Sequence, residues 1–110
     1  MTEADPRAEY RSIIDELVRE CLEGQGTVLP LWVRRGKLPQ EREINVMLAR
    51  LSPEDRALIA RMLRDAYWGA VHDALRVLND SQVPPFDQSY EGTPYQDFVG
   101  RLSGEWAWPD

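Results

Sequence analysis

The residue types best suited to chemistry lie close together in the chain, at Asp65, Trp68, His72 and Asp73. On a helix, Asp65 and His72 are nearly eclipsed, while Trp68 and His72 are four residues apart and can stack. A carboxylate beside a histidine and an aromatic wall is the pattern of an acid/base or ligand-binding patch. The alternative, which we favour, is a solvated charged face of a long helix with Trp68 covered by another segment.

Asp73 needs a separate interpretation because of its position around the same helix. Its helical angle places it about 60° from the centre of the predicted apolar side, where an unpaired carboxylate is costly. One interpretation is a reactive or ligand-contacting acid. The other, which we favour, is a buried link that accepts a hydrogen bond from a tryptophan, an arginine or a helix N-terminus.

Two tryptophans, Trp106 and Trp108, lie near the C-terminal end of the sequence. They alternate along the chain next to a proline, so one short helix cannot cover both. We favour docking of one or both over the open end of the helical core, which would hold the terminal segment down. The alternative is an exposed aromatic patch of the kind enriched at interfaces.

Several kinds of active site find no matching pattern in this sequence. Cys21 and His72 are the only cysteine and histidine, too few for a zinc site, and no phosphate-binding loop, EF-hand loop or nucleophile elbow is present. Cys21 falls on an apolar helical stripe, which predicts a buried structural thiol. We therefore expect no catalytic residue, cofactor or metal, and a candidate binding surface made of Asp65, Trp68, His72, Asp73, Trp106 and Trp108.

Helical periodicity predicts the elements that position these residues. We expect an all-α domain spanning 1–110, a compact bundle of four to five helices around one long central helix at about 53–79, with an irregular proline-rich loop at 80–92. The predicted helices cover 5–23, 27–36, 39–51, 53–79 and 94–103. The apolar side predicted for the long helix consists of Ile59, Met62, Leu63, Ala66, Ala70, Ala74 and Val77.

The charge is acidic overall and unevenly distributed. The 110 residues include 13 basic and 19 acidic side chains, for a net charge of −6, which argues against nucleic acid as the main partner. Residues 34–64, however, carry eight basic and four acidic side chains. The cluster of Arg34, Arg35, Lys37 and Arg42 either meets an acidic partner or neutralises the two acidic ends within the fold, and we favour neutralisation.

Several short motifs resemble a family of short bacterial proteins of uncharacterised function. The run Leu51-Ser52-Pro53-Glu54, the pair His72-Asp73, and a tyrosine-containing segment that leads to Trp106 and Pro109 carry the resemblance. It covers residues 10–27 and 51–110 and departs from the family pattern around 30–50 and after Asn79. The resemblance implies an all-α fold in which Asp73 and the terminal Trp-Pro are structural, and it implies no catalytic residues.

Together these features favour a small acidic interaction or regulatory protein without catalysis, in one specific version a toxin-neutralising immunity-type protein. The alternative is a small-molecule binder or hydrolase-type enzyme that uses Asp65, His72 and Asp73 near Trp68. We expect a protein partner or a homo-oligomer, with no nucleic acid and no membrane. The start of the sequence lacks the pattern of a signal peptide, and no apolar run approaches the length of a membrane span, so we expect a cytoplasmic location.

Overall fold

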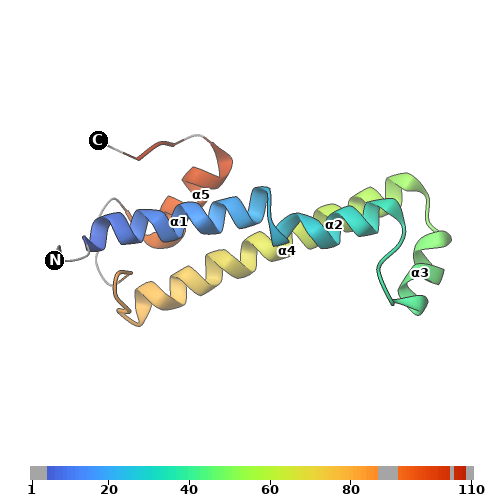
Figure 1. The fold of residues 1–110 in the computed structure, drawn as a ribbon, viewed down its shortest axis with the longest axis horizontal. Coiled ribbons are helices and arrows are strands. Elements are labelled where there is room, and N and C mark those ends of the chain that lie inside the picture. Colours follow the sequence, from blue (N-terminus) through green and yellow to red (C-terminus); the bar gives the residue numbers. More distant parts are fainter. Residues whose placement is uncertain (1–4, 87–91, 105, 109–110) are drawn as a thin grey trace. The chain divides into compact units, whose positions relative to one another are not determined.

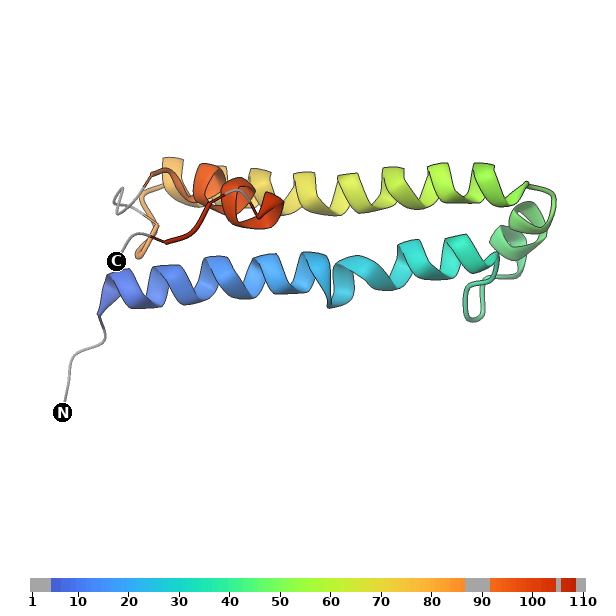
Figure 2. The same cartoon turned by 90° about the horizontal axis from the view of Figure 1, so that it is seen from above.

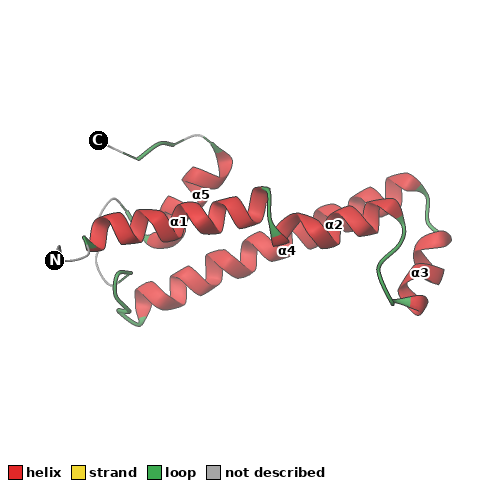
Figure 3. Cartoon of the chain, viewed as in Figure 1, coloured by secondary structure: helices red, strands yellow, loops and turns green. Residues whose placement is uncertain are grey.

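The computed structural model describes residues 5–86, 92–104 and 106–108, and most of these residues are helical (Figures 1 and 3). No strand occurs within these ranges, so the all-α prediction is confirmed, as is the long helix. The helices are α1 (Pro6–Leu22), α2 (Gln25–Arg35), α3 (Arg42–Ala49), α4 (Pro53–Asp80) and α5 (Pro94–Ser103).

The helix ends follow local signals in the sequence. Asp5, Ser52 and Thr93 precede α1, α4 and α5, and their side-chain oxygens accept hydrogen bonds from backbone N–H groups in the first turn, at 3.0, 3.1 and 3.3 Å. These bonds satisfy donors that have no partner within a helix. Gly36 and Gly104 end α2 and α5 in the left-handed conformation, with φ of 83° and 75°, which glycine adopts without steric cost.

The second helix departs from the prediction in its start and in its burial. It begins two residues early and includes Gly26, whereas we expect Gly24 and Gly26 to end the preceding helix. A Cβ at Gly26 would lie 2.9 Å from the Cα of Cys21, so glycine is what lets the two backbones approach here. A helix with this many apolar residues is expected to be buried, but only Val33 is buried and Leu29 and Leu31 are exposed.

The chain divides into two compact units, and the boundary between them falls within α1 and within α4. Unit 1 comprises residues 1–19 and 69–110, and unit 2 comprises residues 20–68. The buried apolar side chains of unit 1 include Tyr10, Ile14, Val18, Leu75, Phe86 and Phe98. The core of unit 2 is a cluster of Val33, Leu38, Leu48 and Ala60, with Trp32, Leu51, Ile59 and Leu63 packed against it.

The side of the long helix that packs is rotated from the one predicted and overlaps it only at Ile59 and Leu63. Met62 and Val77 are 68% and 53% exposed, whereas Ala60 and Leu75 are fully buried. The exposed part of the expected side includes three alanines, and burying alanine removes little apolar area from water. The side that packs in each unit carries larger side chains, which favours its burial; the half-buried members are Leu63, Tyr67, Trp68, Val71 and Leu78.

Two polar side chains hold the connections of unit 2 in place. The Asn45 side chain accepts a hydrogen bond from the Leu38 N–H at 2.7 Å and donates one to the Leu38 carbonyl at 2.8 Å. Arg56 donates to the carbonyls of Arg34 and Leu51, at 3.3 and 3.0 Å. Carbonyls at and beyond helix ends lack helical partners, so Arg56 stabilises the ends of α2 and α3.

Candidate functional site

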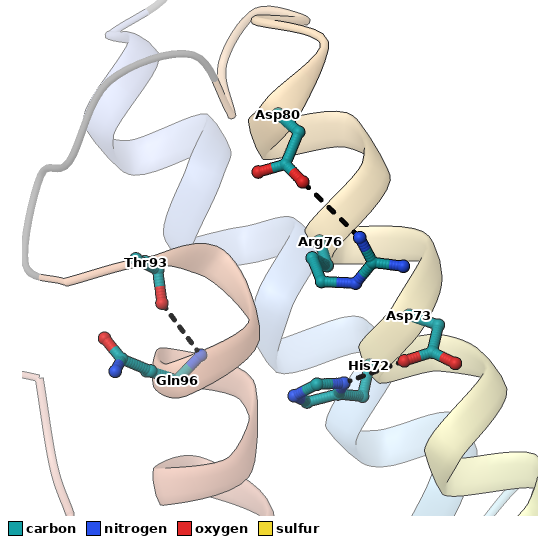
Figure 4. A network of polar contacts seen from close by, with 6 residues as sticks. All are labelled: His72, Asp73, Arg76, Asp80, Thr93 and Gln96. Atoms are coloured by element: carbon teal, nitrogen blue, oxygen red, sulfur yellow. Dashed lines mark hydrogen bonds and ion pairs between the residues drawn. The ribbon is translucent and has the colours of Figure 1, made fainter.

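The residues predicted as an acid/base patch form separate pairs. In unit 1, His72 Nδ1 lies 3.2 Å from an oxygen of Asp73 (Figure 4). The His72 ring also makes an edge contact with Tyr95, with centroids 5.3 Å apart. In unit 2, Arg64 donates two hydrogen bonds to Asp65, at 3.1 and 3.0 Å. The structure therefore gives His72 neighbours other than the predicted Asp65 and Trp68.

Asp73 lies on the surface, and the prediction of a buried linking carboxylate is wrong. Its side chain is 70% exposed, and its partner is the neighbouring His72 (Figure 4). The physical reason is that the part of the predicted apolar side in unit 1, with Ala70, Ala74 and Val77, faces solvent, so a position close to it is hydrated. Replacing Asp73 would remove an exposed contact with His72, and such surface contacts contribute little to stability.

Trp108 packs against α1 and Trp106 packs against Trp108, in line with the favoured docking of one or both tryptophans. Trp108 Nε1 donates a hydrogen bond to Asp15 at 2.9 Å, and its ring makes an edge contact with Tyr10. The Trp106 and Trp108 rings make a second edge contact, with centroids 4.8 Å apart. Both side chains are half-buried. Their apolar surface is thus used largely within unit 1.

A buried carboxylate that the sequence analysis missed lies at Asp97 on α5. The hydroxyl of Tyr10, which is fully buried, donates a hydrogen bond to Asp97 Oδ2. Asp97 shares one face of α5 with Pro94 and Arg101, which lie three and four residues away, and it directly precedes the buried Phe98. The place of Asp97 beside Phe98, on the predicted apolar side of this helix, was the available signal. The pair joins α1 to α5 and stabilises the packing of unit 1.

In unit 2, α2 lies beside the first half of α4 (Figure 2). Arginines line a groove here, which consists of two hollows, the Trp68 pocket and the Leu58 hollow. The two hollows share Arg34, Arg61 and Arg64, and we call the whole the arginine groove. The Trp68 pocket has a volume of about 390 Å³, and its other lining residues are Cys21, Leu22, Gly26, Thr27, Pro30, Leu31, Ala60 and Trp68. The Leu58 hollow also contains Glu54, Ala57 and Leu58.

The arginines of this groove come from separate parts of the sequence. Arg61, Arg64 and Trp68 are spaced by three and four residues along α4, which places them on one side of that helix. Arg34 joins them from the last turn of α2. The Arg64 guanidinium lies over the Trp68 ring, 4.7 Å from its centroid, in a cation–π contact.

The basic side chains in the middle of the chain are mostly unpaired among the described residues. In the part of the chain that the structure describes, Arg34, Arg35, Lys37, Arg42 and Arg61 form no ion pair with a carboxylate. The groove's third arginine, Arg64, is paired with Asp65. The five unpaired side chains are exposed, and neutralisation of the two acidic ends within the fold stays a prediction.

The Cys21 thiol and the Tyr67 hydroxyl are both less acidic than usual. Burial, together with the smaller effect of the nearby Glu20 charge, raises the pKa of the Cys21 thiol to about 11. Burial likewise raises the pKa of Tyr67. Within the described ranges, no group of three or more His, Cys, Asp or Glu side chains is arranged to hold a metal ion. No described helix is both long and apolar enough to cross a membrane.

Comparison with known sequences identifies the family. Residues 3–110 match the family of unknown function DUF6547, and the chain belongs to this family. The match includes the residues around 30–50 at which the resemblance was expected to fail. No curated protein and no solved structure matches the chain.

Proposed function

We propose that this member of DUF6547 is a non-catalytic interaction protein that binds an acidic segment of a protein partner in the arginine groove. The observation that carries this proposal is the set of groove arginines. Arg34 and Arg61 line both hollows, and neither has a carboxylate partner among the described residues. A partner's carboxylates would supply charge-assisted hydrogen bonds to the guanidinium groups.

Exposed apolar side chains along the groove support a protein partner. Leu31 lines the Trp68 pocket and Leu58 lines the Leu58 hollow, and both side chains are exposed. Arginine beside apolar contact area is a frequent composition at the centres of protein interfaces. The matching segment would carry carboxylates together with apolar side chains.

The toxin-neutralising version of this proposal makes the acidic segment part of a toxin. The identity of the neighbouring gene tests this version, because a gene for a toxin at that place would favour it. The alternative hydrolase needs Asp65, His72 and Asp73 to converge. Asp65 is instead hydrogen-bonded to Arg64, and His72 to Asp73, so no geometric observation favours it.

Site-specific photo-cross-linking in the native cell would test the interaction. A benzophenone amino acid at position 58 lies in the groove, and the same group at position 99 of α5 is an exposed control that does not line it. We expect a cross-linked partner from position 58 and not from position 99. Arg61→Met should reduce the yield, and Arg35→Met, which removes an equal charge outside the groove, should not.

Three results would contradict the proposal. The first is the absence of any cross-link from position 58, and the second is an equal yield from position 99. The third is a product of twice the protein's own mass, because it would assign the groove to a second copy of this chain. In that case the groove would be the interface of a homo-oligomer, the other kind of assembly that we predict, and not a site for a different protein.

A further inference from the structure

The Trp68 pocket has the size and composition of a site for a small ligand. Its volume of about 390 Å³ falls within the range of about 300–1,000 Å³ typical of ligand pockets. The walls combine apolar side chains with a few polar groups that converge from α2 and α4. The apolar contribution comes from Cys21, Leu22, Pro30, Leu31 and Ala60.

Trp68, one of the residues that line this pocket, carries a hydrogen-bond donor without an acceptor. Trp68 Nε1 is buried and has no hydrogen-bond partner among the described residues. A buried N–H that lacks an acceptor is destabilising, and most such groups in folded proteins are paired. An oxygen atom of an occupant would supply the missing acceptor.

The charge of the lining residues indicates which kind of polar group the pocket would bind. Three arginines line the pocket, and no Asp or Glu is among its described lining residues. Arg64 is the one groove arginine in an ion pair, with the exposed side chain of Asp65. An anionic group therefore suits this pocket better than a neutral or cationic one.

We propose that the Trp68 pocket binds a small organic monocarboxylate with an apolar body. The carboxylate would pair with Arg61 and Arg64 and accept a hydrogen bond from Trp68 Nε1. The apolar body would lie against Leu31 and Ala60. This ligand goes beyond the proposed function because its binding requires no protein partner, although it uses the same arginines.

Nuclear magnetic resonance of the purified, isotopically labelled protein provides the test, with sodium octanoate as the probe. The indole N–H resonance of Trp68 is identified by its loss in Trp68→Phe. We expect octanoate to shift this resonance with saturable dependence on concentration. 1-Octanol has the same chain without the charge, and we expect it to bind at least about tenfold more weakly.

Matched variants separate pocket binding from general charge effects. We expect Arg61→Met and Arg64→Met each to weaken octanoate binding about tenfold, and Trp68→Phe about fivefold. Arg35→Met removes an exposed charge of α2 that does not line the pocket, so it should leave the affinity unchanged. Far-ultraviolet circular dichroism of each variant verifies that it is folded.

Equal affinity for octanoate and octanol would overturn this inference. So would shifts that do not saturate, or losses in Arg61→Met and Arg64→Met no larger than in Arg35→Met. The outcome is distinguishable from that of the cross-linking experiment. A failed octanoate titration with a cross-link from position 58 removes the ligand and leaves the protein interaction standing, and the reverse pattern does the opposite.

Discussion

At the scale of single residues, Asp15 joins three segments of unit 1 through one carboxylate. One oxygen accepts a hydrogen bond from Arg101 Nε at 2.9 Å, and the other accepts one from Trp108 Nε1 at 2.9 Å. The guanidinium groups of Arg11 and Arg101 lie over the Trp108 ring, 5.3 and 5.8 Å from its centroid. Charge-assisted hydrogen bonds and cation–π contacts thus hold the terminal segment on α1 and α5.

The buried thiol of Cys21 makes stability depend on pH in the alkaline range. Because its folded pKa is raised from 9.0 to about 11, the neutral thiol is favoured in the folded state. Its contribution is complete below pH 9 and is lost as the pH rises towards 11. At pH 10.5 we expect the free energy of unfolding to be lower than at pH 8 by about 2 kcal/mol from this group.

Urea unfolding of the wild type and of Cys21→Ala at both pH values measures this contribution. Other groups titrate in the same range, so the informative quantity is the difference between the two proteins. The wild type should lose more stability than the variant on going from pH 8 to pH 10.5. Identical losses in the two proteins would show that the thiol does not titrate with a raised pKa.

At the scale of elements, the packing of α4 depends on side-chain size more than on periodicity. Its alanines at 66, 70 and 74 are spaced for close helix packing, yet all three are exposed. The buried positions Ala60 and Leu75 lie on a side that also carries tyrosine, tryptophan and valine. The larger apolar area of that side decides which face is covered.

The connection between α2 and α3 depends on Asn45. Its side chain satisfies both backbone groups of Leu38, and Leu38 belongs to the core cluster of unit 2. Asn45→Ala leaves a part-buried donor and acceptor without partners, so we expect it to lower the free energy of unfolding by about 1–3 kcal/mol. Urea unfolding followed by circular dichroism measures this change.

Asn45→Asp is the informative control for that connection. It keeps an acceptor for the Leu38 N–H and removes the donor to the Leu38 carbonyl, so its effect should be the smaller of the two. A loss below about 0.5 kcal/mol in Asn45→Ala, the size of a neutral surface change, would show that water replaces both bonds.

At the scale of the whole molecule, the acidic charge belongs to unit 1. Its sequence carries 12 acidic and five basic side chains, whereas unit 2 carries seven and eight. The net charge of −6 therefore hides a unit that is close to neutral and bears the arginine groove. The acidic partner that we propose would be attracted to unit 2 by this distribution, and its binding there should weaken as the salt concentration rises.

We predict that residues 1–110 form a single domain, so the two units should unfold together. The helices α1 and α4 each have residues in both units and are continuous across the boundary. Opening of one unit therefore also removes hydrogen-bonded turns from a helix that continues into the other unit. We predict one cooperative transition, in which the slowest-exchanging amides of α2 and α5 report the same free energy of opening. Native-state hydrogen exchange at low urea concentrations measures both. A consistently lower value in one unit would indicate two domains.

The helices and most of their ends were predictable from local patterns in the sequence. Asp5, Ser52, Thr93, Gly36 and Gly104 act on backbone groups within a few residues, so their effects do not depend on the rest of the fold. The burial of Tyr10, Ile14, Val18 and Cys21 was also predictable, because α1 has one continuous apolar stripe.

The buried face of α4 and the contacts between distant polar side chains depend on how the helices pack, so the tertiary structure was needed to identify them. Both sides of α4 carry apolar residues, so periodicity alone does not distinguish them, and the exposed Asp73 follows from that choice. Arg34 joins Arg61 and Arg64 only because α2 packs beside α4, and Asp97 meets Tyr10 across 87 positions of sequence. Such contacts depend on the packing of whole elements, which no local pattern specifies.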